Sequence, residues 1–243
     1  MASKKALTGR HQYTEFKYET VANRVKTMMD KRDAYTNVDD LHVKLSYGNR
    51  KTTALVPSVS LIPVADCGNC AQCARGCYDV RHICCYTASQ NQRAVNSAIL
   101  LQDRERYFKE IEDAVKYLRF FRWHVGGDIK DYDYLGQMVG IATRTPNCEF
   151  LVFTKMFDIV NEWLENVGEF PKNFHLLLSG WRRDYNLNPH NLPVSSPVWK
   201  DGEQSCLVTE NAFWCPGNCG ECASVNGGCW GAKKGDTILF EAH

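Results

Sequence analysis

Hydrophobic residues recur at helical intervals through the middle of the chain, and short apolar runs separate the helical segments. Residues 88–120 have the strongest helical periodicity, as one long helix or as two helices joined near Asp103. Further helices are predicted over 131–143 and 156–167, and strands over 119–125, 149–154 and 174–179. Strands that alternate with helices are typical of βαβ units, so the sequence predicts an α/β fold with a parallel sheet.

The flanking segments are less regular. Residues 20–35 predict a helix, with an apolar face that includes Val21, Val25, Met28 and Met29. Residues 41–46 alternate as a half-buried strand does, and 54–64 predict a strand confined to an edge by Pro57 and Pro63. Later segments are interpreted as a turn over 47–52, a loop over 186–197, a strand over 205–209 and a closing strand over 236–243. The resulting division is a helical extension (1–40), an α/β body (41–205) and a cysteine-rich tail (206–243).

The bulk composition narrows the function classes. The chain has 243 residues, of which 44% are hydrophobic and 23% charged, with a net charge of +1. This near-neutral balance argues against nucleic acid as a partner. No run approaches the roughly 20 apolar residues of a membrane helix, and the N-terminal residues lack the apolar core of a signal peptide. A cytoplasmic protein without a membrane partner is therefore expected.

Twelve cysteines are unusual for a chain expected in a reducing compartment, and clustered cysteines there are more often metal ligands than disulfides. The first group has the spacing C-x2-C-x2-C-x3-C and consists of Cys67, Cys70, Cys73 and Cys77. This spacing is known from iron–sulfur ligands of ferredoxins, although Tyr78 stands where the ferredoxin run has proline. A four-thiolate zinc site is the alternative.

A second group lies in the tail and consists of Cys215, Cys219, Cys222 and Cys229. Neighbouring glycines would let the chain wrap closely around a metal. The tail is interpreted as a second closed iron–sulfur cluster, with structural zinc as the alternative. The remaining cysteines are interpreted as packing residues: Cys84, Cys85, Cys148 and Cys206.

Polar residues follow the predicted strands at their carboxyl ends, where α/β folds place their ligands. The candidate cofactor-binding residues are Gly126, Gly127, Asp128, Thr154, Lys155 and Ser179. Lys155 could hold a carboxylate or a phosphate, and Asp128 could accept a hydrogen bond from an ammonium group or a ribose. His124 lies in an apolar run and is interpreted as a core histidine. These ends and the first cysteine loop are expected to meet at one rim.

The order of these motifs resembles the phage gene product 88 family over residues 43–243. The motifs are Gly48-Asn49-x-Lys51-Thr52, Cys77-Tyr78, Phe121-Arg-Trp-His124-x-Gly126-Gly-Asp128, Phe153-Thr-Lys155, Pro171-x-Asn173 and Ser179-x-Trp181. That family in turn looks like a relative of radical-SAM enzymes. The resemblance implies a partial (β/α) barrel, a [4Fe–4S] cluster in the loop after the first strand, and S-adenosylmethionine on the rim near Gly126. A phage-encoded chain would act in the host cytoplasm.

The cysteine loop departs from the radical-SAM pattern. Those enzymes use C-x3-C-x2-C, so three thiolates leave one iron open, whereas the loop here has four candidate ligands. Cys215-x3-Cys219-x2-Cys222 has the enzyme spacing but follows the barrel strands. Two hypotheses result. One is a radical-SAM enzyme with an electron donor and an unidentified small-molecule substrate. The other is a non-catalytic iron–sulfur or zinc protein for electron transfer, sensing or partner binding.

Overall fold

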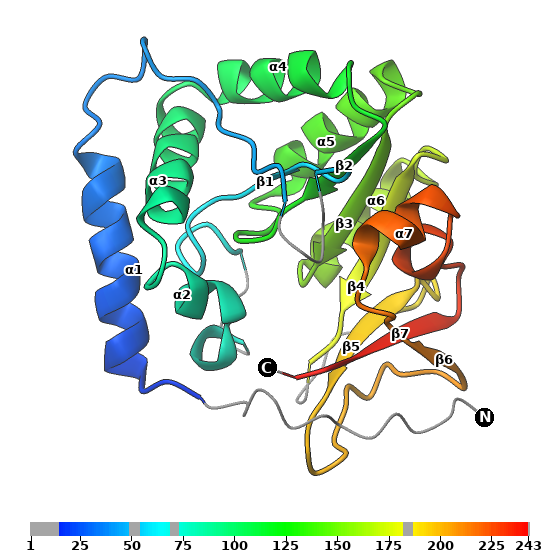
Figure 1. Ribbon diagram of the computed structural model, residues 1–243. Helices are drawn as coiled ribbons and strands as arrows, with labels where there is room; N and C mark the ends of the chain where they lie inside the picture. Colours follow the sequence, from blue (N-terminus) through cyan, green and yellow to red (C-terminus); the bar gives the residue numbers. More distant parts are fainter. Residues whose placement is uncertain (1–14, 49–53, 69–72, 182–186, 243) are drawn as a thin grey trace.

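The architecture is α/β, built on a seven-stranded parallel sheet with the order β1-β2-β3-β4-β5-β7-β6 (Figure 1). The computed structural model describes residues 15–48, 54–68, 73–181 and 187–242. The strands are β1 (Ser58–Val59), β2 (Phe120–Trp123), β3 (Glu149–Thr154), β4 (Phe174–Ser179), β5 (Val194–Val198), β6 (Asn211–Trp214) and β7 (Asp236–Glu241). Every neighbouring pair is parallel, which confirms the predicted parallel sheet.

The helices confirm the periodicity of the middle of the chain. They are α1 (Tyr18–Asp33), α2 (Tyr78–His82), α3 (Thr87–Gln102), α4 (Arg104–Val115), α5 (Tyr132–Arg144), α6 (Phe157–Asn166) and α7 (Cys219–Ser224), with short 3₁₀ turns η1 (Ala74–Gly76) and η2 (Gly228–Trp230). The long helical segment is two helices, because the Asp103 side chain caps α4 by accepting from the Arg106 amide at 3.0 Å. Asp131 caps α5 in the same way through the Tyr134 amide.

The two faces of the sheet pack differently because side chains alternate along each strand. Helices α3 to α6 lie along one face of the sheet (Figure 1). Apolar residues such as Phe121, Phe150 and Leu176 form the main core on that face. The opposite face is covered in part by α7 and η2, and Trp230 packs there against Phe120 with ring centroids 5.3 Å apart. The rest of that face borders a cavity.

The strand predicted over 41–46 is wrong. This segment makes one isolated antiparallel bridge, between Ser46 and Ser58. Helix side chains take the place of a neighbouring strand: the Val43 amide donates to Glu110 Oε2 at 2.7 Å, and the Lys44 amide donates to Asn96 Oδ1 at 2.8 Å. The backbone is therefore satisfied without a ladder, and the apolar alternation reflects packing on the core.

The loop predicted over 186–197 is also wrong in its last part, because Val194–Val198 forms the buried strand β5. Pro193 and Pro197 hid this strand. The carbonyls of Pro193 and Ser195 accept hydrogen bonds from the Leu178 and Gly180 amides, at the end of β4. Backbone polar groups of alternate residues in a strand point to the same side, so the nitrogen of Pro197 also points toward β4. The pairing with β4 ends at Ser195, so the missing Pro197 amide breaks no hydrogen bond there.

Two features of the tail differ from expectation. Residues 205–209 form a turn, in which the Leu207 amide donates to Ser205 Oγ at 3.1 Å, and the strand follows later as β6. The closing strand β7 is confirmed, but it lies between β5 and β6 and not at the sheet edge. The predicted turn over 47–52 lies largely outside the described residues, so the structure does not test it.

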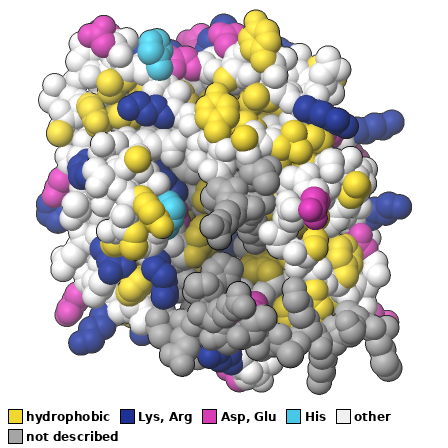
Figure 2. Space-filling model, viewed as in Figure 1, with side chains coloured by type: hydrophobic (Ala, Val, Ile, Leu, Met, Phe, Trp, Pro, Cys, Tyr) yellow, Lys and Arg dark blue, Asp and Glu magenta, His cyan; other side chains and the backbone are white. Residues whose placement is uncertain are grey.

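Charges of both signs surround the face of the molecule shown in Figure 2. This distribution agrees with the small net charge of the sequence. None of the helices within the described ranges combines the length and the apolar content needed to cross a membrane.

Candidate functional site

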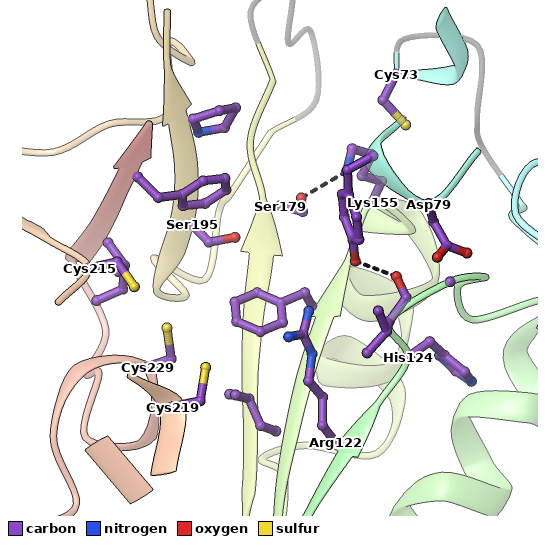
Figure 3. Close-up of a pocket in the computed structure, with 18 of the residues that line it drawn as sticks. Cys73, Asp79, Arg122, His124, Lys155, Ser179, Ser195, Cys215, Cys219 and Cys229 are labelled. Carbon is purple, nitrogen blue, oxygen red and sulfur yellow. Dashed lines mark hydrogen bonds between the residues drawn. The ribbon is translucent and has the colours of Figure 1, made fainter. Parts of the chain in front are cut away.

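Both cysteine groups border one cavity of about 360 Å³ on the face of the sheet opposite helices α3 to α6. The first group contributes Cys67, Cys73 and Cys77, whereas Cys70 lies outside the described residues. The second group contributes Cys215, Cys219, Cys222 and Cys229. Figure 3 shows Cys215, Cys219 and Cys229 on one side of the cavity and Cys73, Asp79 and Lys155 on the other.

The loop that carries the first group is fixed at its start by Asp66. The Asp66 carboxylate is buried and accepts from the Ile62 amide at 3.0 Å, from Lys130 Nζ at 2.7 Å and from the Ser97 hydroxyl. The Asp66 carbonyl accepts from the Asp128 amide at 3.1 Å, which ties the loop to the segment after β2. A buried carboxylate with this many donors holds the loop entrance in one position.

The tail carries its cysteines on short, anchored elements. Cys215 extends β6, since its amide donates to the Leu239 carbonyl at 2.7 Å. Cys219 and Cys222 belong to α7, which Asn218 caps through the Glu221 amide at 3.1 Å. Gly228 has a φ of +55°, and a Cβ there would lie 3.0 Å from Cys222 Sγ, so glycine allows the close turn that presents Cys229.

The thiols influence one another's protonation. Burial raises the pKa of Cys77 to about 12, with a further contribution from Cys73. Burial likewise raises the pKa of Cys229 to about 12, with contributions from Cys215 and Cys219. Thiols with such pKa values carry protons at neutral pH, and a bound metal is the usual means of displacing protons from them.

The predicted rim residues converge as expected, with one exception. Gly126, Gly127, Asp128, Lys155 and Ser179 all line the cavity. Thr154 is fully buried behind it and donates to Asp128 Oδ1 at 2.6 Å. Thr154 therefore positions Asp128, and the prediction that Thr154 itself binds a cofactor stays a prediction.

Asp128 has structural partners for both carboxylate oxygens. Besides Thr154, the Ile129 amide donates to Oδ1 at 2.7 Å and the Lys155 amide donates to Oδ2 at 2.9 Å. Burial raises the pKa of this carboxyl group, and the hydrogen bond from Thr154 opposes the rise. Asp128 thus joins the ends of β2 and β3.

Lys155 extends from the end of β3 toward the cavity. Its Nζ donates to Ser179 Oγ at 2.8 Å (Figure 3). The same atom lies 5.4 Å from the centre of the Trp181 ring. Burial acts to lower the pKa of Lys155, but the nearby Cys73, Asp128 and Cys77 outweigh it, and the pKa is raised overall. A cation held here would offset negative charge on thiolates of the first group.

A buried ion pair under the rim was not predicted. Asp79 and Arg93 have side chains that are 1% and 4% exposed, and they form two hydrogen bonds, at 2.9 and 2.6 Å. This pair explains Gly126, because a Cβ there would lie 1.9 Å from Asp79 Oδ2. Gly127 has a φ of +87° and leaves no room for a Cβ beside Leu61. The glycine pair is thus required by packing.

Gly126→Ala is expected to destabilise the fold by about 2–4 kcal/mol, because the methyl group must displace the buried Asp79 carboxylate. Urea unfolding measures the change. Gly136→Ala is the matched control, since it lies inside α5 and the nearest atom to its Cβ is 3.6 Å away. That variant should gain about 0.5–1 kcal/mol from helix propensity, and equal effects of the two substitutions would contradict the packing argument.

His124 is a core histidine, as predicted, and also borders the cavity. Its Nε2 lies 2.8 Å from the Tyr134 hydroxyl, and burial lowers its pKa to about 3. The unfolded chain, with an ordinary histidine pKa of about 6.5, binds a proton that the folded chain does not. The free energy of unfolding should therefore fall as the pH drops from about 6.5 toward 3, by at most about 1.4 kcal/mol per pH unit from this residue.

His124→Gln should lower the number of protons taken up on unfolding by close to one, and so reduce the slope of the unfolding free energy against pH. Glutamine keeps a side chain that can form a hydrogen bond with Tyr134. Urea unfolding at several pH values between 4 and 7 gives the slope. The control is His42→Gln, since the His42 side chain is 80% exposed. Equal slopes for His124→Gln and the unmodified chain would show that His124 is protonated in the folded state.

Three of the four cysteines interpreted as packing residues are not buried. Cys148 is buried against the main core, as predicted. Cys84 and Cys85 are exposed after α2, and Cys206 is exposed as well, so the packing interpretation of these three is wrong. None of these four cysteines lines the cavity.

The side chains available as metal ligands around the cavity are mainly cysteine thiols, which is the ligand type of iron–sulfur centres. Within the described ranges, however, no three His, Cys, Asp or Glu side chains lie close enough together to hold a single metal ion. A zinc ion holds its thiolates about 2.3 Å from one point. A four-iron cluster is a larger body and separates its thiolates more widely.

A family model described as Gene product 88 matches residues 24–223. The chain belongs to the gene product 88 family. The matched range, 24–223, begins before the range 43–243 over which the motifs resemble the family, and it ends 20 residues before it. Cys229 and β7 therefore lie outside the match. Comparisons of this gene product 88 protein with curated proteins and with solved structures found no match.

Proposed function

We propose that the chain is a radical-SAM-like iron–sulfur protein with a [4Fe–4S] cluster in the loop after β1. One observation carries the proposal: thiols from two segments far apart in sequence border a single cavity. Cys67, Cys73 and Cys77, together with Cys70, would hold the cluster, and the tail cysteines would hold a second one. Thiolates are the usual ligands of such clusters.

The proposed fold type is a partial (β/α) barrel. Strands β1 to β5 follow one another across the sheet in chain order and are all parallel. Helices α3 to α6 pack on one face, and the cavity lies on the other, which would be the barrel interior. This arrangement supports the proposal, because β/α barrels place helices outside and ligands at the carboxyl ends of the strands.

The chain's own residues have defined tasks in this proposal. A reduced cluster, when bound, would supply the electron that cleaves S-adenosylmethionine into methionine and a 5′-deoxyadenosyl radical. Lys155 would offset thiolate charge, and Asp128 would position Lys155 through its amide. Gly126 and Gly127 would leave backbone beside the cavity uncovered by side chains. A cytoplasmic location would keep the thiols reduced for metal binding.

A second candidate is a non-catalytic iron–sulfur protein that transfers electrons, senses or binds a partner. The observation in its favour is the number of thiols, because four tail cysteines line the cavity and could close a cluster completely. Closure of the first group by Cys70 would likewise leave no iron open for S-adenosylmethionine. Structural zinc in the tail is the remaining alternative for that group.

EPR spectroscopy of the anaerobically purified, reduced chain tests the proposal. A reduced-cluster signal that shifts when S-adenosylmethionine is added would indicate an open iron and support the enzyme. A signal that does not respond would favour the non-catalytic candidate. The absence of any cluster signal, with zinc as the bound metal, would contradict both iron–sulfur candidates.

A further inference from the structure

We propose that Arg122 is the anchor for the carboxylate of a small ligand that binds in the cavity through an otherwise apolar body. This inference names a ligand class for the same cavity and rests on the proposed function in treating that cavity as a substrate site. It depends on the position of one arginine, its lack of partners and the walls around it.

Arg122 occupies a position in β2 where a charged residue is costly. Its strand neighbours Phe121 and Trp123 are fully buried against the helices, so Arg122 faces the opposite side of the sheet, as Phe120 does. Its guanidinium points into the cavity, between the tail cysteines and His124 (Figure 3). A cation that is removed from water on a sheet face destabilises the fold unless an anion pairs with it.

Among the described residues, no carboxylate forms an ion pair with this guanidinium. Arg122 Nε is buried and has no hydrogen-bond partner. The contact found for its guanidinium is the face of the Phe153 ring, 4.9 Å from the ring centre. The other charged groups that line the cavity have partners of their own: Asp79 pairs with Arg93, Asp128 accepts three hydrogen bonds, and Lys155 donates to Ser179. Glu241 also lines the cavity and has an interaction partner.

The surroundings of Arg122 favour a carboxylate on an apolar molecule. A guanidinium presents a planar pair of donors that matches a carboxylate in two parallel hydrogen bonds. Leu151, Phe153, Ile238 and Phe240 line the cavity on the same face of the sheet and would contact the ligand body. A volume of about 360 Å³ is within the range of small-molecule sites. Apolar walls also disfavour strongly hydrated dianions.

Calorimetric titration of the anaerobically purified chain with 3-phenylpropionate and with 3-phenylpropionamide tests this inference. The two probes have similar shapes and differ in charge. The acid should bind about 10-fold or more tightly than the amide, since a hydrogen-bonded charge contributes more than a neutral pair. Equal affinities, or no binding of the acid, would overturn the inference without any variant.

Two variants locate the effect. Arg122→Gln should weaken binding of the acid by roughly 10- to 100-fold and leave the amide unchanged, whereas Arg122→Lys should fall between. The control is Arg119→Gln, because Arg119 directly precedes the same strand, is exposed and does not line the cavity. Its guanidinium lies 5.1 Å from the centre of the Phe120 ring. Tight binding of the acid to Arg122→Gln would overturn the inference.

Iron content measured on the same samples separates this inference from the proposed function. Preference for the acid in a chain without iron would sustain the ligand class and contradict the iron–sulfur proposal. An iron-loaded chain that binds both probes equally would support the iron–sulfur proposal and overturn the ligand inference. The charge of Arg122 would then be assigned to balancing the nearby thiolates.

Discussion

Replacing Cys77 with Ser is expected to remove about half of the bound iron, close to four of about eight atoms per chain if each cysteine group holds one four-iron cluster. Cys77 is half-buried, lines the cavity and directly precedes α2, so its replacement removes one candidate ligand of the first group. Cys229→Ser should remove the other half, because Cys229 closes the tail group. Iron and sulfide analysis of the anaerobically purified variants measures both losses.

The controls for these variants come from the chain itself. Cys85→Ser changes an exposed thiol after α2, and Cys148→Ser changes a buried thiol on the far side of the sheet from the cavity. Both should keep the full iron content. If Cys77→Ser also kept its iron, the first cysteine loop would not be a cluster site.

Breaking the buried Asp79–Arg93 pair should destabilise the fold by about 3–5 kcal/mol, as removal of one partner from a buried ion pair usually does. Arg93→Met leaves the Asp79 carboxylate buried beside Gly126 without its two hydrogen bonds. Urea unfolding gives the change in free energy. The pair lies directly under the rim, so the variant should also loosen the start of α2 near Cys77.

Two comparisons make this prediction specific. The double variant Asp79→Leu with Arg93→Met should recover much of the lost stability, because no charge then remains buried without a partner. Lys26→Met breaks an exposed ion pair with Asp30, in which the side chains are 71% and 60% exposed, and should cost less than about 1 kcal/mol. A similar loss for Lys26→Met and Arg93→Met would contradict the argument from burial.

Local patterns in the sequence predict the middle of the fold well. Helices α3 to α6 and strands β2 to β4 have clear periodicity, and Asp103 and Asp131 mark two helix starts by their capping chemistry. The rule that parallel strands present their carboxyl ends together correctly grouped Gly126, Lys155 and Ser179. These features depend on short-range order, which a single sequence contains.

The remaining features depend on contacts between distant segments. Strand β5 was hidden by Pro197, whose missing amide is harmless only because β4 has already ended. The tail cysteines reach the cavity because β7 inserts between β5 and β6, an order that no local pattern indicates. Arg122 was not predicted as a site residue. The signal that could have indicated it is a charged residue inside an otherwise apolar strand.

The most direct test of the central proposal is metal and sulfide analysis of the chain purified without oxygen. The account predicts about eight irons and about eight acid-labile sulfides per chain if both cysteine groups hold four-iron clusters, and about four of each if only one does. Zinc bound without sulfide, or a chain that contains neither metal, would contradict the iron–sulfur proposal.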